Sequence, residues 1–282
     1  MKLNTWVIYL IFISLSLTAF AGKIAIVKYP PDGPGDWGAY YHSLADTLLQ
    51  EGHEVDYDRH FGWREPRGYN SYFLVINNYL TSSQVDSLQS YLTLGGRLIL
   101  QENGYYPRTS DYLSVDGWPC YTGNPYWNII YPTDTLPSVW ADSIDPDGGI
   151  VWTVSFATEF SSSWEPARGI DTLTSCWFIT YTFEDSGALK AVAFGGADAS
   201  TSLYDSFPPV ILSGQCGRGD IVVLGGQCLL CDIPTPVYPD CFNMLRFHDN
   251  CQFARQLFQC NERADSAWLI LENDSTAKVY LE

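Results

Sequence analysis

Apolar and polar residues alternate along the first third of the chain in a way that predicts strands and helices in turn. A buried strand is expected over Lys23–Tyr29, and apolar residues at helical spacing over 37–49 predict a helix that Gly52 ends. Alternation over His53–Asp58 predicts a second strand, and the apolar run Tyr72–Asn77 predicts a third.

The next segment continues this alternation. Thr81 and Gln84 have the spacing of a capping box, which marks the start of a second helix before Gly95. A fourth strand is expected over Arg97–Gln101. Strands that alternate with helices over short loops predict an α/β fold, a flavodoxin-like three-layer sandwich with a mainly parallel sheet. In the commonest such order, the first strand lies between the second and the third.

The regular alternation ends after Glu102. Residues 104–175 are rich in Trp, Tyr, Pro, Gly and Asp, and they predict an irregular, aromatic-rich insertion with a few short strands. Its aromatic side chains either bind sugars and proteins or fill a small core of their own. Further expected elements are an antiparallel pair of strands over 176–183 and 189–194, a hairpin over 209–215 and 220–224, a helix capped by Asp249, and a C-terminal hairpin over 268–272 and 277–281.

Composition narrows the classes of function. The chain has 282 residues, of which 46% are hydrophobic, so it can bury a sizeable core. The formal net charge is -17, which repels phosphate backbones and argues against nucleic acid as a partner.

The N-terminus has the pattern of a secretory signal peptide over residues 1–21. Lys2 precedes an apolar stretch over 6–17, and Ala19 and Ala21 fit the small-x-small rule for cleavage after Ala21. The alternative is a membrane anchor, but the stretch is shorter than the roughly 20 residues that span a bilayer. We therefore expect a secreted, periplasmic or cell-surface protein with one domain over 22–262, a hairpin or adjoining module over 263–282, and no membrane span after cleavage.

Eight cysteines in an exported chain predict disulfides. Spacing alone leaves their connectivity open, except that Cys251 and Cys260 are too far apart to bond if one helix carries both. A zinc site that includes Cys216 and Cys241 is the alternative, and a redox role is disfavoured because prolines follow the C-x-x-C pair. The disulfide candidates are Cys120, Cys176, Cys216, Cys228, Cys231, Cys241, Cys251 and Cys260.

Three segments carry a resemblance to a known family. They are KIAIV with the helix after it, YFLVINNYLTSSQVDSLQSYLTLGGRLILQENG, and GRGDIVVLGGQ followed by FHDNCQFARQLF. Together they resemble the class I glutamine amidotransferase-like domains, and they cover both ends of the mature chain but not its middle. Catalytic members of this family carry a Cys nucleophile on the turn after the strand that corresponds to residues 97–101. This chain has Gln101-Glu102-Asn103-Gly104 there and no cysteine. The resemblance therefore implies the fold without amidotransferase activity.

Polar residues follow the expected strands at their carboxyl ends, where open α/β sheets bind ligands. They could form a ligand pocket or serve acid–base chemistry, or they could only cap helices and satisfy turns. The ligand-pocket candidates are Asp32, Asn77, Asn78, Glu102, Asn103, Gln227, His248 and Asp249.

Two functions remain open at this stage. The first is a non-catalytic module that binds a protein or glycan at the cell surface, with no cofactor and no metal. The second is an exported hydrolase that uses Glu102 and His248, which requires the two side chains to converge on one substrate atom. A glycine-rich phosphate loop at Gly33 is disfavoured because Asp32 and Asp36 would repel a phosphate.

Overall fold

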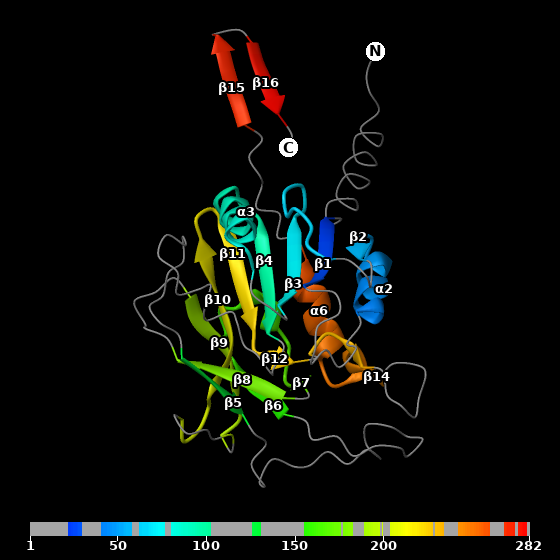
Figure 1. The fold of residues 1–282 in the computed structure, drawn as a ribbon, viewed down its shortest axis with the longest axis vertical. Coiled ribbons are helices and arrows are strands. Elements are labelled where there is room, and N and C mark those ends of the chain that lie inside the picture. Colours follow the sequence, from blue (N-terminus) through cyan, green and yellow to red (C-terminus); the bar gives the residue numbers. More distant parts are fainter. Residues whose placement is uncertain are drawn as a thin grey trace, which may run out of the picture.

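A nine-stranded mixed sheet forms the body of the molecule in the computed structural model (Figure 1). The structure describes residues 22–29, 41–57, 62–76, 80–102, 126–130, 155–175, 177–182, 189–197, 199, 204–227, 229–233, 242–259, 268–273 and 276–280.

One half of the sheet is parallel. Its strands lie in the order β2 (Glu54–Tyr57), β1 (Lys23–Tyr29), β3 (Ser71–Ile76), β4 (Arg97–Glu102) and β11 (Gly219–Leu224). Each neighbouring pair in this half is parallel. The prediction that the first strand lies between the second and the third is therefore confirmed.

The other half of the sheet is antiparallel. It continues from β11 through β10 (Pro209–Cys216), β9 (Leu189–Gly195), β6 (Ser155–Phe160) and β7 (Leu173–Ser175). The expectation of a mainly parallel sheet is wrong, because the sheet has four parallel and four antiparallel pairings. The physical reason is that the segment after β4 returns through hairpins instead of helical crossovers.

The hairpin of β10 and β11 joins the two halves as predicted. Its turn places Gly217 in the left-handed region, with φ of 64°, where a side chain would be strained. Because β11 is parallel to β4 and antiparallel to β10, the sheet changes from parallel to antiparallel pairing at this hairpin.

Helix α3 (Ser82–Thr93) begins as its sequence predicts. The Gln84 amide N–H donates to Thr81 Oγ1, and the Thr81 N–H donates to Gln84 Oε1 at 2.7 Å, which completes the capping box. The helix is followed by Gly95, whose φ of 108° suits a residue without a side chain.

Two further helices cover the opposite face of the sheet. They are α2 (His42–Gln50) and α6 (Asn250–Phe258), while two short 3-10 turns, η1 (Glu165–Ala167) and η2 (Met244–Arg246), pack against α6. Asp249 is the N-cap residue of α6, as predicted, but its side chain makes no capping bond, so that part of the expectation is wrong.

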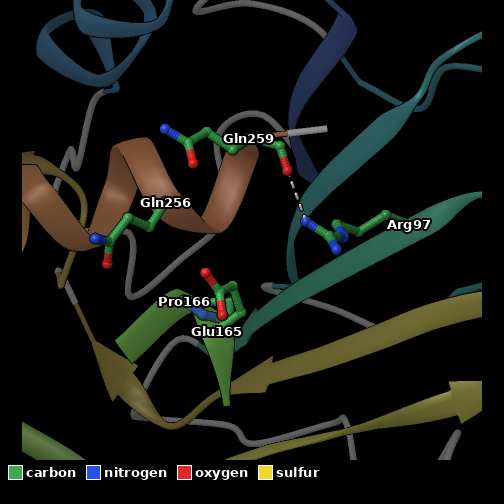
Figure 2. A pocket seen from close by; sticks show the side chains of 5 residues that line it. All are labelled: Arg97, Glu165, Pro166, Gln256 and Gln259. Atoms are coloured by element: carbon green, nitrogen blue, oxygen red, sulfur yellow. Dashed lines mark hydrogen bonds between the residues drawn. The ribbon is translucent and has the colours of Figure 1, made fainter. Parts of the chain in front are cut away.

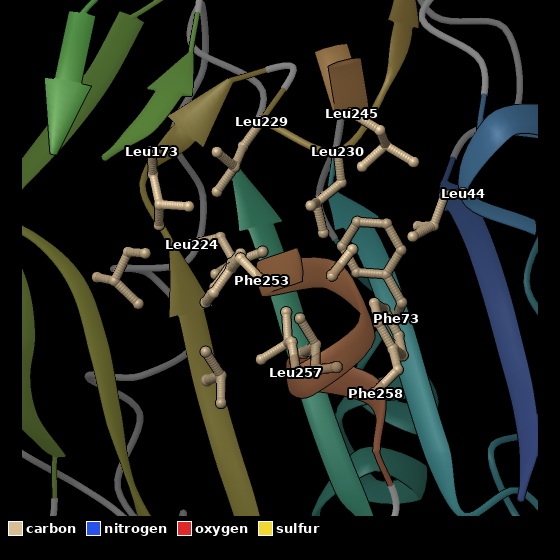
Figure 3. Packing of buried hydrophobic residues seen from close by; sticks show 14 of the residues in the cluster. Leu44, Phe73, Leu173, Leu224, Leu229, Leu230, Leu245, Phe253, Leu257 and Phe258 are labelled. Carbon is tan, nitrogen blue, oxygen red and sulfur yellow. The ribbon is translucent and has the colours of Figure 1, made fainter. Parts of the chain in front are cut away.

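Alternation along β1 creates a separate core on each face. Ile24 and Ile26 pack with α2 and α6, whereas Ala25 and Val27 pack with α3. Figure 3 shows the first of these cores, in which Phe253, Leu257 and Phe258 of α6 lie over the sheet beside Phe73 of β3. Helices therefore cover both faces of the parallel strands, as expected from the sequence.

A second, smaller sheet lies near the antiparallel half. Its order is β12 (Gly226–Gln227), β8 (Trp177–Thr182) and β5 (Tyr126–Ile130). The expected pairing of β8 with β9 is wrong, since β9 pairs with β10 and β6. Phe178 of β8 is fully buried, and Thr180 Oγ1 donates to the Pro209 carbonyl at 2.8 Å, so β8 packs across the large sheet and not beside β9.

The insertion expected over 104–175 is partly regular. Its last part, over 155–175, contains β6, η1 and β7, and it supplies the edge of the large sheet. Two short hairpins complete the fold: β13 (Asp232–Ile233) with β14 (Phe242–Asn243), and the predicted C-terminal pair β15 (Trp268–Asn273) with β16 (Thr276–Tyr280).

Three of the eight cysteines lie among the described residues. Cys216 is fully buried at the end of β10 and is disulfide-bonded, whereas Cys231 is a buried thiol in the core, so the disulfide expected for Cys231 is wrong. Cys251 is a half-buried free thiol, so the expectation that it pairs with another cysteine is wrong. Its side chain packs against the core that α6 shares with the sheet. Outside the described residues lie Cys120, Cys176, Cys228, Cys241 and Cys260.

Candidate functional site

The carboxyl ends of the parallel strands form the candidate site, but the structure describes only some of the predicted residues there. The backbone of Glu102 ends β4, and the backbone of Gln227 ends β12, which contacts β4. These two predicted residues therefore lie at neighbouring strand ends. Outside the described residues lie Asp32, Asn77, Asn78 and Asn103.

Gln101, next to the end of β4, is a site residue that the sequence reasoning missed. Its side chain is buried, and Nε2 donates to the Tyr41 hydroxyl at 2.9 Å. Gln101 Oε1 is buried with no hydrogen-bond partner in the described structure. A buried acceptor of this kind costs free energy unless another group satisfies it.

Tyr41 links this glutamine to the start of α2. It is the N-cap residue of the helix, its amide donates to the Tyr57 hydroxyl at 2.9 Å, and its ring packs edge-on against Phe73. Tyr41 is thereby held from its backbone, its ring and its hydroxyl. A fixed Tyr41 in turn fixes the orientation of the Gln101 amide.

Asp232 brings a buried carboxylate to the same helix. The side chain is 3% exposed, and Oδ2 accepts a hydrogen bond from the Ser43 amide in the first turn of α2 at 2.8 Å. The helix N-terminus favours negative charge there. Asp232 Oδ1 is buried and has no hydrogen-bond partner in the described structure. The sequence signal for Asp232 and Gln101 was present but small, namely one polar residue beside an apolar run.

His248 lies at a different place, on the turn before α6. It is exposed, its backbone has a φ of 39°, and Nδ1 lies 2.6 Å from Thr174 Oγ1 of β7. Phe156 of β6 packs edge-on against its ring. These two contacts of His248 both come from the antiparallel half of the sheet.

Asp249 does not orient the imidazole of His248. Its Oδ2 accepts hydrogen bonds from the amides of Asp171 at 2.8 Å and Thr172 at 3.0 Å, so the carboxylate holds the segment before β7. A general base of the triad type needs a third group that orients it. Asp249 therefore serves the fold in this structure.

The next residue, Asn250, is the strongest polar link between α6 and β7. It is fully buried, and its Oδ1 accepts from the Thr174 amide at 2.9 Å. Its Nδ2 donates to the carbonyls of Thr174, Leu229 and Met244 at 2.8, 3.1 and 2.9 Å.

A small polar pocket of about 80 Å³ lies at the amino end of β4, away from the carboxyl edge (Figure 2). Arg97 contributes its guanidinium, whose Nη1 donates to the carbonyls of Leu257 at 3.0 Å and Gln259 at 3.1 Å at the end of α6. Nη2 lies 3.4 Å from Asp220 Oδ2. Arg97 therefore ties the end of α6 to β4 and β11. The pocket is lined by Arg97, Glu165, Pro166, Gln256 and Gln259.

The described residues offer neither a metal site nor a membrane-spanning helix. They contain no group of three or more His, Cys, Asp or Glu side chains that could hold a metal ion. No described helix combines the length and apolarity that crossing a bilayer requires.

Comparison with known proteins supports the fold. No protein-family model matches the sequence, and no curated protein matches it. The structure is similar to the N-terminal domain of mmIFT52, with a TM-score of 0.52 and 12% identity over 84% of this chain and 96% of that domain. It is also similar to a ThuA-like protein from Parabacteroides merdae, with a TM-score of 0.51 and 9% identity over 92% of this chain and 98% of that one.

At such low identity these similarities show the fold alone. They are consistent, at a coarse level, with the amidotransferase-like fold class that the sequence resembles. They assign no activity and no ligand to this chain.

Proposed function

We propose that the protein is an exported, non-catalytic amidotransferase-like domain that binds a protein or a glycan at the cell surface. The proposal includes the finer fold assignment, a flavodoxin-like core extended by an antiparallel half. The observation that carries it is the role of Asp249, whose carboxylate binds the backbone of residues 171 and 172 instead of the His248 ring in the part of the chain that the structure describes.

The sequence around β4 supports the same proposal. The resemblance implies a cysteine on the turn after this strand, and the chain has Glu102, Asn103 and Gly104 there. A thioester cannot form without a thiolate nucleophile.

The carboxyl edge supports a binding role. Gln101 and Asp232 each present a buried oxygen without a partner in the described structure, and both connect to the N-terminal turn of α2. Unsatisfied acceptors in a native protein call for an explanation, and a ligand that donates hydrogen bonds is one. Sugar hydroxyls and protein N–H groups both have this chemistry.

The exported hydrolase is the second candidate, and the geometry does not favour it. Its two residues belong to different elements, with Glu102 on β4 and His248 beside β7. The contacts described for His248 come from Thr174 and Phe156. A hydrolase would need Glu102 within reach of the same substrate atom.

An activity assay tests the non-catalytic part. Purified protein is incubated with glutamine, and ammonia release is followed over hours beside a His248→Ala variant. We expect no ammonia above the buffer blank for either protein. Release that the variant abolishes would contradict the proposal and would show that a nucleophile lies elsewhere in the chain.

A binding assay tests the ligand class. Labelled protein is applied to an oligosaccharide array and to intact cells before and after removal of surface glycans. We expect saturable binding that Gln101→Met weakens about tenfold. The variant removes a hydrogen-bond acceptor, and the loss of its bond to the ligand should cost about 1.4 kcal/mol of binding free energy. Glu165→Gln, in the pocket at the opposite end of β4, is the matched control and should bind as the parent does. Binding to neither glycans nor cells would overturn the proposed function.

A further inference from the structure

The first described residue of the chain is anchored on both sides of its peptide unit. Gly22 is buried, and its carbonyl accepts from the Glu54 amide at 3.0 Å. Its own nitrogen donates to His53 Nδ1 at 3.1 Å. The Gly22 nitrogen is thus held at the start of β1, beside the start of β2.

The surrounding structure holds His53 in position to accept this bond. It follows the left-handed Gly52 at the end of α2, and its amide donates to the Leu48 carbonyl at 3.1 Å. The residue is 5% exposed, so the surrounding protein and not solvent holds its ring in place. Because Nδ1 accepts a hydrogen bond, it must carry no proton, and the proton of the neutral ring is on Nε2.

We propose that cleavage between Ala21 and Gly22 releases an α-amino group that remains at this position and donates to His53 Nδ1. The inference rests on the exported state in the proposed function. In the cleavage, a leader peptidase breaks the C–N bond with water. The hydroxyl adds to the Ala21 carbonyl carbon, and a proton goes to the Gly22 nitrogen. The nitrogen that is an amide donor in the precursor becomes an amine in the mature chain.

The order of events follows from burial. Proteases act on exposed segments of chain, and Gly22 is buried and bonded at both its nitrogen and its oxygen. The bond before it is accessible only until β1 pairs with β2. Cleavage therefore precedes the folding of this edge of the sheet.

The charged groups that face this pair lie on three elements. Glu51 is at the end of α2 and favours positive charge on His53. Lys23 of β1 and Glu54 of β2 form an ion pair across the strands, with 2.8 Å between Nζ and Oε1. The mature amino group adds one positive charge beside the imidazole.

The pair makes stability depend on pH. Burial lowers the pKa of His53 below its ordinary value of 6.5, and the charge of Glu51 opposes this in part. A histidine whose pKa is lower in the folded than in the unfolded protein contributes its full stabilisation above pH 6.5. This contribution is lost as the pH falls through the pKa of the folded state. In the mature chain, protonated His53 would also face a like charge on the Gly22 ammonium.

The first test is the N-terminus of the exported protein. The full chain, residues 1–282, is expressed in a secreting host, and the product is sequenced from its N-terminus and weighed intact. We expect Gly22 as the first residue. Any other terminus, or an uncleaved chain in the medium, would overturn the inference.

The second test compares two chains that differ by one residue. One begins at Gly22 and the other retains Ala21, which restores an amide at Gly22 and moves the ammonium away from His53. On acidification from pH 7.5 to pH 5, we expect Tm to fall about 2–4 °C further for the chain that begins at Gly22. His53→Gln, which accepts a hydrogen bond without titrating, should remove the difference.

Equal losses of Tm in the two chains would overturn the role of the amino group. Neither test involves a ligand. A failed binding assay with a Gly22 terminus and a pH-sensitive Tm would count against the proposed function alone, and the reverse outcome would count against this inference alone.

Discussion

The two halves of the large sheet differ in how well local sequence patterns predict which of their strands pair. In the parallel half, α2 separates β1 from β2, and α3 separates β3 from β4, so these partners are close along the chain, whereas β11 joins β4 from far along the chain. In the antiparallel half, β6 pairs with β9. Strand β8, which lies between these two along the chain, belongs to the smaller sheet. Local patterns predict the first kind of pairing, whereas the second depends on contacts that no short window contains.

Helix α6 connects the two halves. Its apolar side chains pack with Phe73 of β3, and Asn250 at its start binds the backbone of β7. The antiparallel edge is therefore held to the parallel half by buried polar bonds as well as by apolar packing. The predictions below test this contrast.

The largest loss of stability is expected for Asn250→Ala. The variant leaves one amide and three carbonyls without their partner, and we expect a loss of about 3–5 kcal/mol in the free energy of unfolding. Urea denaturation followed by tryptophan fluorescence measures it. Gln252→Ala, an exposed position on the same helix, should cost under about 1 kcal/mol. If the two variants lose equally, Asn250 does not hold the halves together.

Gly219→Ala tests the turn where the sheet changes from antiparallel to parallel. A Cβ atom there would lie 2.3 Å from the Gly96 carbonyl oxygen and 2.7 Å from that of Leu92, and both are backbone atoms that cannot rotate away. We expect a loss of about 2–4 kcal/mol. Gly68→Ala is the control, because no atom lies within 4 Å and only its φ of 93° opposes a side chain, for about 1 kcal/mol. A loss at position 219 no greater than at 68 would mean that α3 and β11 can separate.

Arg97→Leu removes the link between the end of α6 and the parallel strands. The side chain is 13% exposed and binds two carbonyls and Asp220, so we expect a loss of about 1–3 kcal/mol. Arg168→Leu, at a side chain that is 80% exposed, should change stability by less than about 0.5 kcal/mol. Hydrogen exchange should also show faster opening of the last turn of α6 in Arg97→Leu, and unchanged exchange there would contradict the assigned role.

The smallest effect is expected within the parallel half, at the start of α3. Thr81→Ala removes the hydroxyl that accepts from the Gln84 amide and should cost about 1 kcal/mol. Thr81→Ser keeps the hydroxyl and should recover most of this loss in the same thermal melts. A larger loss here than at Asn250 would reverse the comparison, because local capping would then outweigh the long-range link.

Several local features were predictable because their causes lie within a few residues. The capping box of Thr81 and Gln84 formed as the spacing indicated, and the strand order around β1 followed from the alternation of strands and helices. The hairpin of β10 and β11 was marked by the glycines at its turn. Each of these depends on hydrogen bonds or steric limits inside a short segment.

The candidate site was predictable only in part. Glu102 and Gln227 lie at strand ends, but the rule that pointed to them gave no reason to include Gln101 and Asp232. Asp249 was expected to cap its own helix and instead binds Asp171 and Thr172, far away along the chain. A carboxylate accepts from whichever N–H groups the fold brings to it, and the sequence does not reveal which these are.

The amino-acid sequence by itself determined the strands and helices of the parallel half, the turns between them and the alternation that gives the sheet a core on each face. These follow from periodicity, capping and glycine geometry, which act over a few residues. Only the tertiary structure decided that the large sheet continues through β10, β9, β6 and β7, that β8 leaves it, and that Asn250 and Asp249 hold its edge. The reason is that long-range strand pairing and buried polar contacts depend on which surfaces meet after the chain collapses, and many pairings satisfy the same local pattern.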